Sequence, residues 1–257
     1  MKLQIVSDLH LEFAANRAWL KQNPLIPVGD ILLIAGDCCT LRHPEIAQEF
    51  FYKIAQEFPI IISTLGNHEF YGSDIELANP LFACHESFNH LALNNHSYIY
   101  EDLRIICSIL WSHVPSYNIE LIEKSINDYH HIYKMQKDGK LYPIRVEDTN
   151  ALHEISYRYI QQTVAEPFEG KTVVLTHHMP SYKCISERYK NSPLSSAFAA
   201  NMDEIIQANP QISYWFYGHA HDFQRIQVHN SILIRNPLGY VDSGEHVDFR
   251  RDYFVEI

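Results

Sequence analysis

The sequence predicts an α/β protein with mixed sheets that are covered by helices. Three observations support this fold class. Five short runs consist almost wholly of apolar, β-forming residues, at positions 2–6, 30–35, 59–64, 172–175 and 212–217. One stretch between two of these runs has helical periodicity, and two others have the pattern of antiparallel strand pairs. Short apolar runs of this kind are typical of strands buried on both faces.

The second and third runs flank a predicted helix. Residues 44–58 begin with Pro44, and Pro is favoured in the first turn of a helix. The apolar residues of this stretch fall three to four apart, as on one face of a helix: Ile46, Phe50, Phe51, Ile54 and Phe58. A strand, a helix and a second strand in succession predict a parallel crossover unit.

Two further stretches make the strand directions mixed. Residues 98–110 have the pattern of two strands that meet at Glu101 and Asp102. Residues 223–236 have the pattern of a second antiparallel pair, which turns near Asn230. Parallel and antiparallel neighbours are therefore expected in the same protein.

The range 112–170 is polar and rich in Tyr and His, and it ends in a helical stretch. That stretch places Leu152, Ile155, Tyr159 and Ile160 on one face. We interpret the range as a helical insertion over one edge of the sheets. An ordinary pair of surface helices would have the same pattern.

The composition is that of a globular chain and restricts its partners. With no linker evident, we expect the 257 residues to form a single domain, 1–257. The net charge of −11 and the lack of a Lys/Arg stripe count against duplex nucleic acid. Five Cys favour reduced thiols in a cytoplasmic protein, and neither a membrane span nor a secretory signal is expected. These features leave the oligomeric state open.

A cluster of polar side chains follows each of the five apolar runs. Ligands bind at the carboxyl ends of the strands in open sheets of this kind. Strands that lie side by side would bring together Asp8, His10, Asp37, Asn67, His68, His177, His178, His219 and His221. So many ionisable groups in one cleft are costly to desolvate. A pair of divalent cations removes this cost, and these donor types suit Mn, Fe and Zn.

Each cluster alone is compatible with a common turn, but their order along the chain is more specific. The chain resembles the calcineurin-like metallophosphoesterase superfamily in five blocks: Asp8-x-His10, Gly36-Asp37, Gly66-Asn67-His68-Glu69, Thr176-His177-His178 and Gly218-His219-x-His221. The resemblance extends from residue 8 to residue 221. It implies a four-layer α/β/β/α sandwich of two mixed sheets with flanking helices, and a dinuclear metal site at the sheet ends.

The resemblance also assigns the ligands of two divalent or trivalent ions, with Mn favoured and Fe or Zn as alternatives. One ion takes Asp8, His10, Asp37 and His221, and the other takes Asp37, Asn67, His177 and His219. Asp37 therefore bridges the two ions. His178 competes with His177 for one place. We expect His177 because it occupies the matching position, and we place His178 outside the direct ligand set.

The resemblance gives other roles to His68 and Glu69, the two residues that follow Asn67. His68 matches the residue that protonates the leaving alkoxide or stabilises the transition-state charge. An imidazole suits this role because it titrates near neutral pH. We count His68 and Asp37 as catalytic. Glu69 is expected to anchor the loop behind the ligands, although a structural carboxylate would look the same.

The activity implied is that of a metal-dependent phosphoric ester hydrolase in which a metal-bound hydroxide attacks phosphorus directly. The expected substrate is a small-molecule phosphomonoester, phosphodiester or nucleotide. One alternative is a nuclease acting on short or single-stranded nucleic acid. Another is a catalytically silent scaffold, which is disfavoured because no expected ligand is missing.

The chain departs from relatives that dephosphorylate proteins. Those relatives have an Asp and an Arg where this chain has Thr40 and Leu65. The loss of a bidentate phosphate clamp argues against a protein phosphatase. Arg42 and Arg188 are candidates to replace it, and their spacing does not decide between them. Residues 128–134 and 235–244 are candidates for the rim of the site, where a surface helix and a plain turn would look the same.

Overall fold

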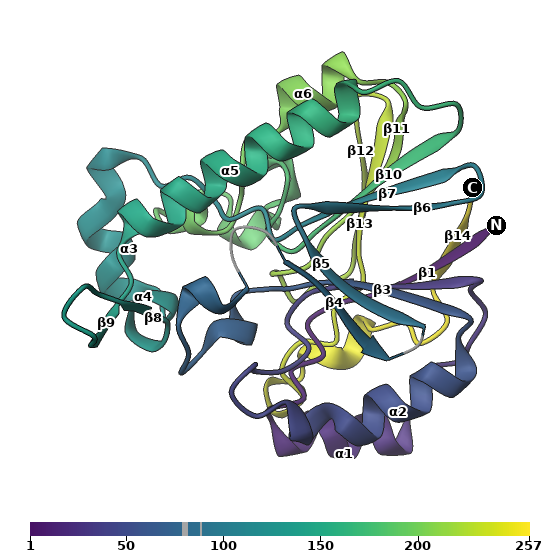
Figure 1. The fold of residues 1–257 in the computed structure, drawn as a ribbon, viewed down its shortest axis with the longest axis horizontal. Coiled ribbons are helices and arrows are strands. Elements are labelled where there is room, and N and C mark those ends of the chain that lie inside the picture. Colours follow the sequence, from purple (N-terminus) through teal and green to yellow (C-terminus); the bar gives the residue numbers. More distant parts are fainter. Residues whose placement is uncertain (79–81, 88) are drawn as a thin grey trace.

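Two mixed β-sheets lie face to face, and helices cover the outer side of each (Figure 1). The structure is a computed structural model that describes residues 1–78 and 89–257, together with the backbone of 82–87. Its layers run from helices through two sheets to helices. The predicted four-layer α/β/β/α sandwich is therefore confirmed.

The first sheet has six strands within the described residues. Their order is β14 (Phe254–Glu256), β1 (Lys2–Val6), β2 (Ile31–Ala35), β3 (Ile60–Thr64), β5 (His90–Asn94) and β4 (Phe82–Ser87). The four central strands are parallel to one another, whereas β14 and β4 are antiparallel to their neighbours. The first three predicted runs are confirmed as β1, β2 and β3.

The second sheet also has six strands in the described part of the chain. Their order is β12 (Gln224–Val228), β13 (Ser231–Arg235), β11 (Ile212–Phe216), β10 (Lys171–Thr176), β7 (Leu103–Ser108) and β6 (His96–Tyr100). Again the four central strands are parallel and the edge strands antiparallel. Both predicted antiparallel pairs are confirmed, as β6 with β7 and β12 with β13.

Apolar side chains from both inner faces form the core between the sheets. Ile5 and Leu33 of the first sheet belong to the same buried cluster as Val173, Leu175 and Phe216 of the second. The outer face of the first sheet packs on α1 (Ala14–Gln22) and α2 (Gln48–Glu57). The outer face of the second packs on α5 (Val146–Ala165) and α6 (Asp203–Ala208). The central strands are therefore apolar throughout because both of their faces are covered.

The helix predicted at 44–58 begins as a 3-10 turn at Pro44–Ala47 and continues as α2. Its predicted apolar face is the face that packs on the sheet, with Ile54 and Phe58 at its centre. Strands β2 and β3 on either side of it are parallel neighbours. The expected crossover unit is confirmed.

The range 112–170 contains α3 (Ile119–Ser125), α4 (Asp128–His131), a hairpin of β8 (Tyr133–Met135) and β9 (Leu141–Pro143), and α5. The predicted apolar face of α5 is partly wrong, because Ile155 is 39% exposed. Small side chains such as Thr149, Ser156 and Thr163 are buried instead. Their size lets the helix lie close to the layer beneath it, so burial here follows shape more than hydropathy. Among the described helices, none has the length and apolar character needed to cross a bilayer.

Candidate active site

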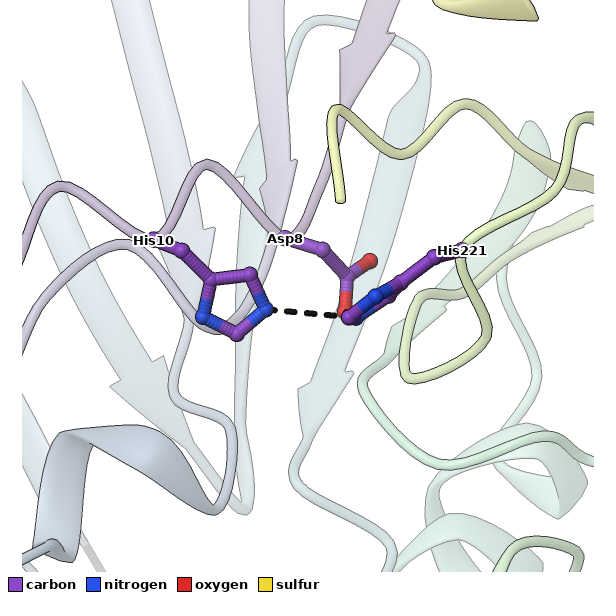
Figure 2. Close-up of side chains that lie close together, drawn as sticks. All are labelled: Asp8, His10 and His221. Carbon is purple, nitrogen blue, oxygen red and sulfur yellow. Dashed lines mark hydrogen bonds and ion pairs between the residues drawn. The ribbon is translucent and has the colours of Figure 1, made fainter. Parts of the chain in front are cut away.

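The predicted site residues meet where β1, β2, β3, β10 and β11 end. Three side chains from the first and fifth motif blocks form one group, Asp8, His10 and His221. Figure 2 shows these three directed toward one another. Asp37, His177 and His219 form a second group, which Asn67 joins through a contact with His177. The structure thus brings together all seven residues predicted as ligands.

The backbone bends sharply at these strand ends. Asp8, His10, Asp37 and His219 have φ values of 50°, 46°, 54° and 67°, in the left-handed region that residues other than Gly rarely adopt. Backbone hydrogen bonds hold the first two in place. The N–H of Asp8 donates to Gly36 O (3.0 Å) and the N–H of His10 donates to Asp37 O (2.9 Å). Strain of this kind persists where the surrounding structure enforces it, and it is frequent at functional sites.

In the first group, the imidazoles of His10 and His221 face each other through their Nε2 atoms. The Nε2 atoms of His10 and His221 are 3.2 Å apart, and Asp8 Oδ1 lies 3.5 Å from His221 Nε2. The Nδ1–H of His10 donates to Glu12 Oε1 (3.0 Å), and that of His221 donates to Glu245 Oε2 (2.6 Å). Because these bonds place a proton on Nδ1 of each ring, Nε2 is the atom of each ring that can bind a metal ion.

The second group converges on one ring nitrogen. His177 Nε2 lies 2.9 Å from Asn67 Oδ1, 3.1 Å from His219 Nδ1 and 3.4 Å from Asp37 Oδ2. The Nδ1–H of His177 donates to Ala35 O (2.8 Å). This bond again leaves Nε2 as the ring atom that can bind a metal ion together with the other donors.

These donor sets fit metal ions. Acceptor atoms directed at one another in a buried site repel unless a proton or a metal ion lies among them. Asp8 Oδ2 is also buried, and it has no hydrogen-bond partner among the described residues. Asp37 Oδ2 lies between the groups, 3.9 Å from His10 Nε2 and 3.4 Å from His177 Nε2. Imidazole, carboxylate and amide oxygen are the donors that borderline first-row metals prefer.

The charge of the buried carboxylates dominates the electrostatics of the site. Burial lowers the pKa of His177, but the charges on Asp37 and Asp8 and the hydrogen bonds of the ring together raise the pKa to about 9. Burial also lowers the pKa of His221, but the carboxylates of Asp8 and Glu245 together raise it to about 10. At His219 burial prevails and holds the pKa well below its usual value. The field in this cleft therefore attracts cations.

His68 lies beside the second group, and its ring is held on three sides. Its Nδ1–H donates to Glu12 Oε1 (2.9 Å), and its Nε2 lies 3.3 Å from Tyr240 Oη. The ring stacks on Tyr71, with 4.1 Å between the centroids. Burial lowers the pKa of His68, but the charge on Asp37 and the hydrogen bond to Glu12 together raise it above its usual value. The imidazole is thus fixed next to the ligands without belonging to either group.

Glu69 faces away from both groups and holds the backbone. Its carboxylate accepts hydrogen bonds from the N–H groups of Asp37 (3.0 Å), Cys38 (2.6 Å) and Gly66 (2.6 Å). It therefore joins the loops that follow β2 and β3. Burial and the charge on Asp37 raise the pKa of Glu69 to about 7.

His178 also lies behind the ligands. Its ring centroid is 4.2 Å from that of His219, and its buried Nδ1 has no hydrogen-bond partner in the described part of the chain. Burial holds its pKa well below the usual value. Cys38 and Cys39, which follow Asp37 in the chain, belong to the apolar cluster under α1 and α2. These side chains pack the space beneath the site.

Comparisons with known proteins identify the family. The model of the calcineurin-like phosphoesterase family matches residues 1–223. The chain belongs to this family. Its members are phosphoric ester hydrolases that use divalent metal ions, in agreement with the donor groups found here.

One relative and one solved structure cover nearly the whole length of this phosphoesterase. Uncharacterized protein L509 of Acanthamoeba polyphaga mimivirus is 32% identical over 280 residues, which cover 99% of this chain and 96% of the relative. Phosphopantetheinyl hydrolase from Mycobacterium tuberculosis superposes with a TM-score of 0.70 at 15% identity, over 100% of this chain and 95% of that one. The second likeness supports the fold.

Sequence reasoning missed three carboxylates of the phosphoesterase that hold its site together. Glu12 binds both His10 and His68 through one oxygen, and its spacing of two from His10 was an available signal. Glu245 supports His221 from a loop after β13. Asp128 lies in the stretch 128–134 that the sequence marked as a candidate for the rim, but no pattern in that stretch identifies it as the partner of Asn67.

A first hollow of about 410 Å³ opens over the second ligand group of the phosphoesterase. Asp37, Asn67, His219 and His221 line one side of it. Another side is apolar and consists of Met179, Ile185, Leu194 and Phe198. A ligand in this hollow would therefore contact the donor atoms and an apolar surface at once.

Arg188 supplies the positive charge of the first hollow. Among the described residues that line it, Arg188 alone is a Lys or Arg. Its guanidinium lies over the ring of Tyr189, 4.6 Å from the centroid. Arg42, the other candidate from the sequence, lies beside Gly72 and does not line this hollow.

A second hollow of about 400 Å³ lies on the other side of His68. Four residues line both hollows: His68, Tyr71, Asn127 and Tyr240. The two stretches that the sequence marked as rim candidates contribute to it, 128–134 through His131 and 235–244 through Tyr240. The two hollows meet at His68.

Proposed function

We propose that this phosphoesterase hydrolyses small-molecule phosphodiesters with two metal ions, one in each ligand group. The position of Asp37 supports this, because its Oδ2 is 3.9 Å from His10 Nε2 and 3.4 Å from His177 Nε2, one ring nitrogen of each group. Two such ions, Mn before Fe or Zn, would lower the pKa of a water molecule and neutralise the phosphoryl oxygens. Asn67 adds an oxygen donor without adding negative charge.

The residues of the chain then position the reacting groups. Asp8 and Asp37 would supply the negative charge that holds the ions. Glu12 accepts a hydrogen bond from the Nδ1–H of His68, so Nε2 is the atom left to act on the substrate. We assign to His68 Nε2 the transfer of a proton to the leaving ester oxygen, a step that typically contributes about 10²- to 10⁴-fold.

A diester is favoured over a monoester by the two hollows that meet at His68. A diester has two ester arms, and each hollow can take one of them. The charge of the lining supports the same choice. The first hollow combines several carboxylates with a single guanidinium, that of Arg188, among its described residues. Beyond the charge that the two metal ions would neutralise, a diester carries one negative charge and needs less compensation from this lining than a monoester dianion.

The test compares two aryl esters on chelator-treated protein to which Mn²⁺ is restored. We expect kcat/KM to be higher for bis(p-nitrophenyl) phosphate than for p-nitrophenyl phosphate, and activity to require the metal. Asp37→Ala should remove both metals, as measured by mass spectrometry, and abolish turnover. A preference for the monoester, or turnover that survives chelation, would contradict the proposal.

A further inference from the structure

The second hollow is built largely from aromatic side chains. Phe13, Tyr71, His131 and Tyr240 line it. We propose that this hollow binds a planar, uncharged aromatic group on the leaving arm of the substrate, such as a nucleobase. The inference rests on the diesterase function proposed above and names the chemistry of one arm.

Phe13 breaks a local rule of helix formation. It occupies the N-cap of α1 and makes no side-chain cap hydrogen bond, although Ser, Thr, Asp and Asn are strongly preferred there. Its ring is 43% exposed and so contributes little to the core. It meets Tyr240 edge to face, with 5.4 Å between the centroids. A residue that serves neither the cap nor the core points to function.

The remaining rings extend this aromatic lining around His68. Tyr71 stacks on His68 at an interplanar angle of 20°. The ring of His131 lies 5.5 Å from that of Tyr71. Two aromatic pairs, Phe13 with Tyr240 and Tyr71 with His131, thus border one hollow of about 400 Å³. Planar groups stack on such rings with little dependence on their identity.

The polar residues of the second hollow specify the charge of its ligand. Its described lining contains the carboxylate of Glu12 and no Lys or Arg. An arm that carries a further phosphate would therefore meet repulsion without compensation. Thr40 and Asn127 also line the hollow and offer hydrogen bonds to the polar edge of a base or to sugar hydroxyls.

The residues that line the two hollows assign the leaving arm of the substrate to the second hollow. Asp37, Asn67, His219 and His221 line the first hollow, whereas none of the predicted ligands lines the second among its described residues. His68 lines both. A group in the second hollow is therefore separated from the ligand groups by His68. The ester oxygen that joins this group to phosphorus is the one within reach of the imidazole.

The experiment measures binding of the leaving group without turnover. Saturation-transfer NMR on the Zn²⁺-loaded protein is carried out with adenosine, and with ribose for comparison. We expect adenosine to bind and ribose to give no saturable signal. Phe13→Ala should raise the Kd for adenosine about tenfold, as expected for the loss of one stacking partner. Tyr117→Ala, which removes an 88% exposed ring outside both hollows, should leave it unchanged.

Further variants and controls separate a failure of the aromatic subsite from a failure of the proposed reaction. Phe13→Tyr should restore binding, and thermal unfolding confirms that each variant is folded. The aromatic subsite is overturned if adenosine fails to bind, or if it binds to Phe13→Ala and to His131→Ala as tightly as to the wild type. Diester turnover without adenosine binding would likewise overturn the aromatic subsite. Aromatic-dependent binding without diester turnover contradicts the proposed reaction and leaves the subsite standing.

Discussion

The side-chain amide of Asn67 donates a hydrogen bond to the carboxylate of Asp128 over 2.8 Å. The same oxygen of Asp128 accepts from Tyr71 Oη, also at 2.8 Å. Because this carboxylate accepts, the NH₂ end of the amide must face Asp128. The carbonyl end is thereby directed at His177 Nε2, 2.9 Å away. Asp128 thus orients Asn67 as an oxygen donor toward the second ligand group.

Replacing Asp128 by Asn should weaken metal binding at the second group by about 10- to 100-fold, the usual effect of losing a residue that orients a ligand. The new amide can offer its own NH₂ to Asn67, whose side chain is then free to turn. Calorimetric titration with Mn²⁺ resolves the two binding events. Asp102→Asn, at the turn between β6 and β7, is the matched control. Equal losses at both groups would assign Asp128 a general structural role.

Replacing Glu12 by Gln should slow turnover most for substrates with poor leaving groups. One neutral carbonyl cannot replace a carboxylate oxygen that serves both His10 and His68. We expect kcat to fall by about 10- to 100-fold for a dialkyl phosphodiester, whose leaving group is an alkoxide. The loss should be smaller for bis(p-nitrophenyl) phosphate, because nitrophenolate needs little protonation.

The metal content of this Glu12 variant must be measured alongside its kinetics, because His10 is also a predicted ligand. Mass spectrometry should find the metals retained. Glu49→Gln, on the exposed side of α2, serves as the comparison. An equal fall in kcat for both substrates would contradict the role of Glu12 in orienting His68.

Replacing Arg188 by Ala should raise KM for bis(p-nitrophenyl) phosphate and leave kcat near the wild-type value. The guanidinium is exposed, so its contact with a phosphate oxygen is screened and contributes roughly 1 kcal/mol, or about fivefold in KM. Arg42→Ala removes the same charge from outside the first hollow and should have no effect on steady-state kinetics. If the two variants behave alike, then Arg188 acts only through the net charge.

The strands and their polar ends were predictable because they rest on local patterns. The apolar run at 59–64 ends in a loop where Asn67, His68 and Glu69 follow one another. The pattern marks all three, yet their surroundings differ. Asn67 joins the second ligand group, His68 lies between two hollows, and Glu69 binds backbone N–H groups. Only the position of each side chain in space separates these roles.

Contacts between distant segments could not be predicted in the same way. Asp128 reaches Asn67 across 61 positions of the chain, and Glu12 reaches His68 across 56. The periodicity of apolar residues along the chain does not indicate such pairs. The buried face of α5 was mispredicted for a related reason, since the shape of the neighbouring layer decides which of its side chains are covered.

His90 is buried in the first sheet, away from the predicted ligands. It is 2% exposed, its ring stacks on Phe51 with 5.1 Å between centroids, and its Nε2 shares a hydrogen bond with Ser63 Oγ (2.9 Å). Burial disfavours the imidazolium and lowers the pKa of His90 to about 4. The unfolded chain binds this proton near pH 6.5. The stability gained from the neutral ring is therefore present above pH 6.5 and is lost as pH falls toward 4.

Replacing His90 by Gln should make stability less sensitive to acid. Gln can keep the hydrogen bond to Ser63 but does not titrate. Between pH 7.5 and 5, the wild type should lose about 2 kcal/mol more unfolding free energy than the variant. Urea unfolding in the presence of a chelator measures this difference, because the other histidines contribute equally to both proteins. His43→Gln, at a surface position, should follow the wild type. Parallel losses in wild type and His90→Gln would mean that His90 takes up its proton without opening the sheet.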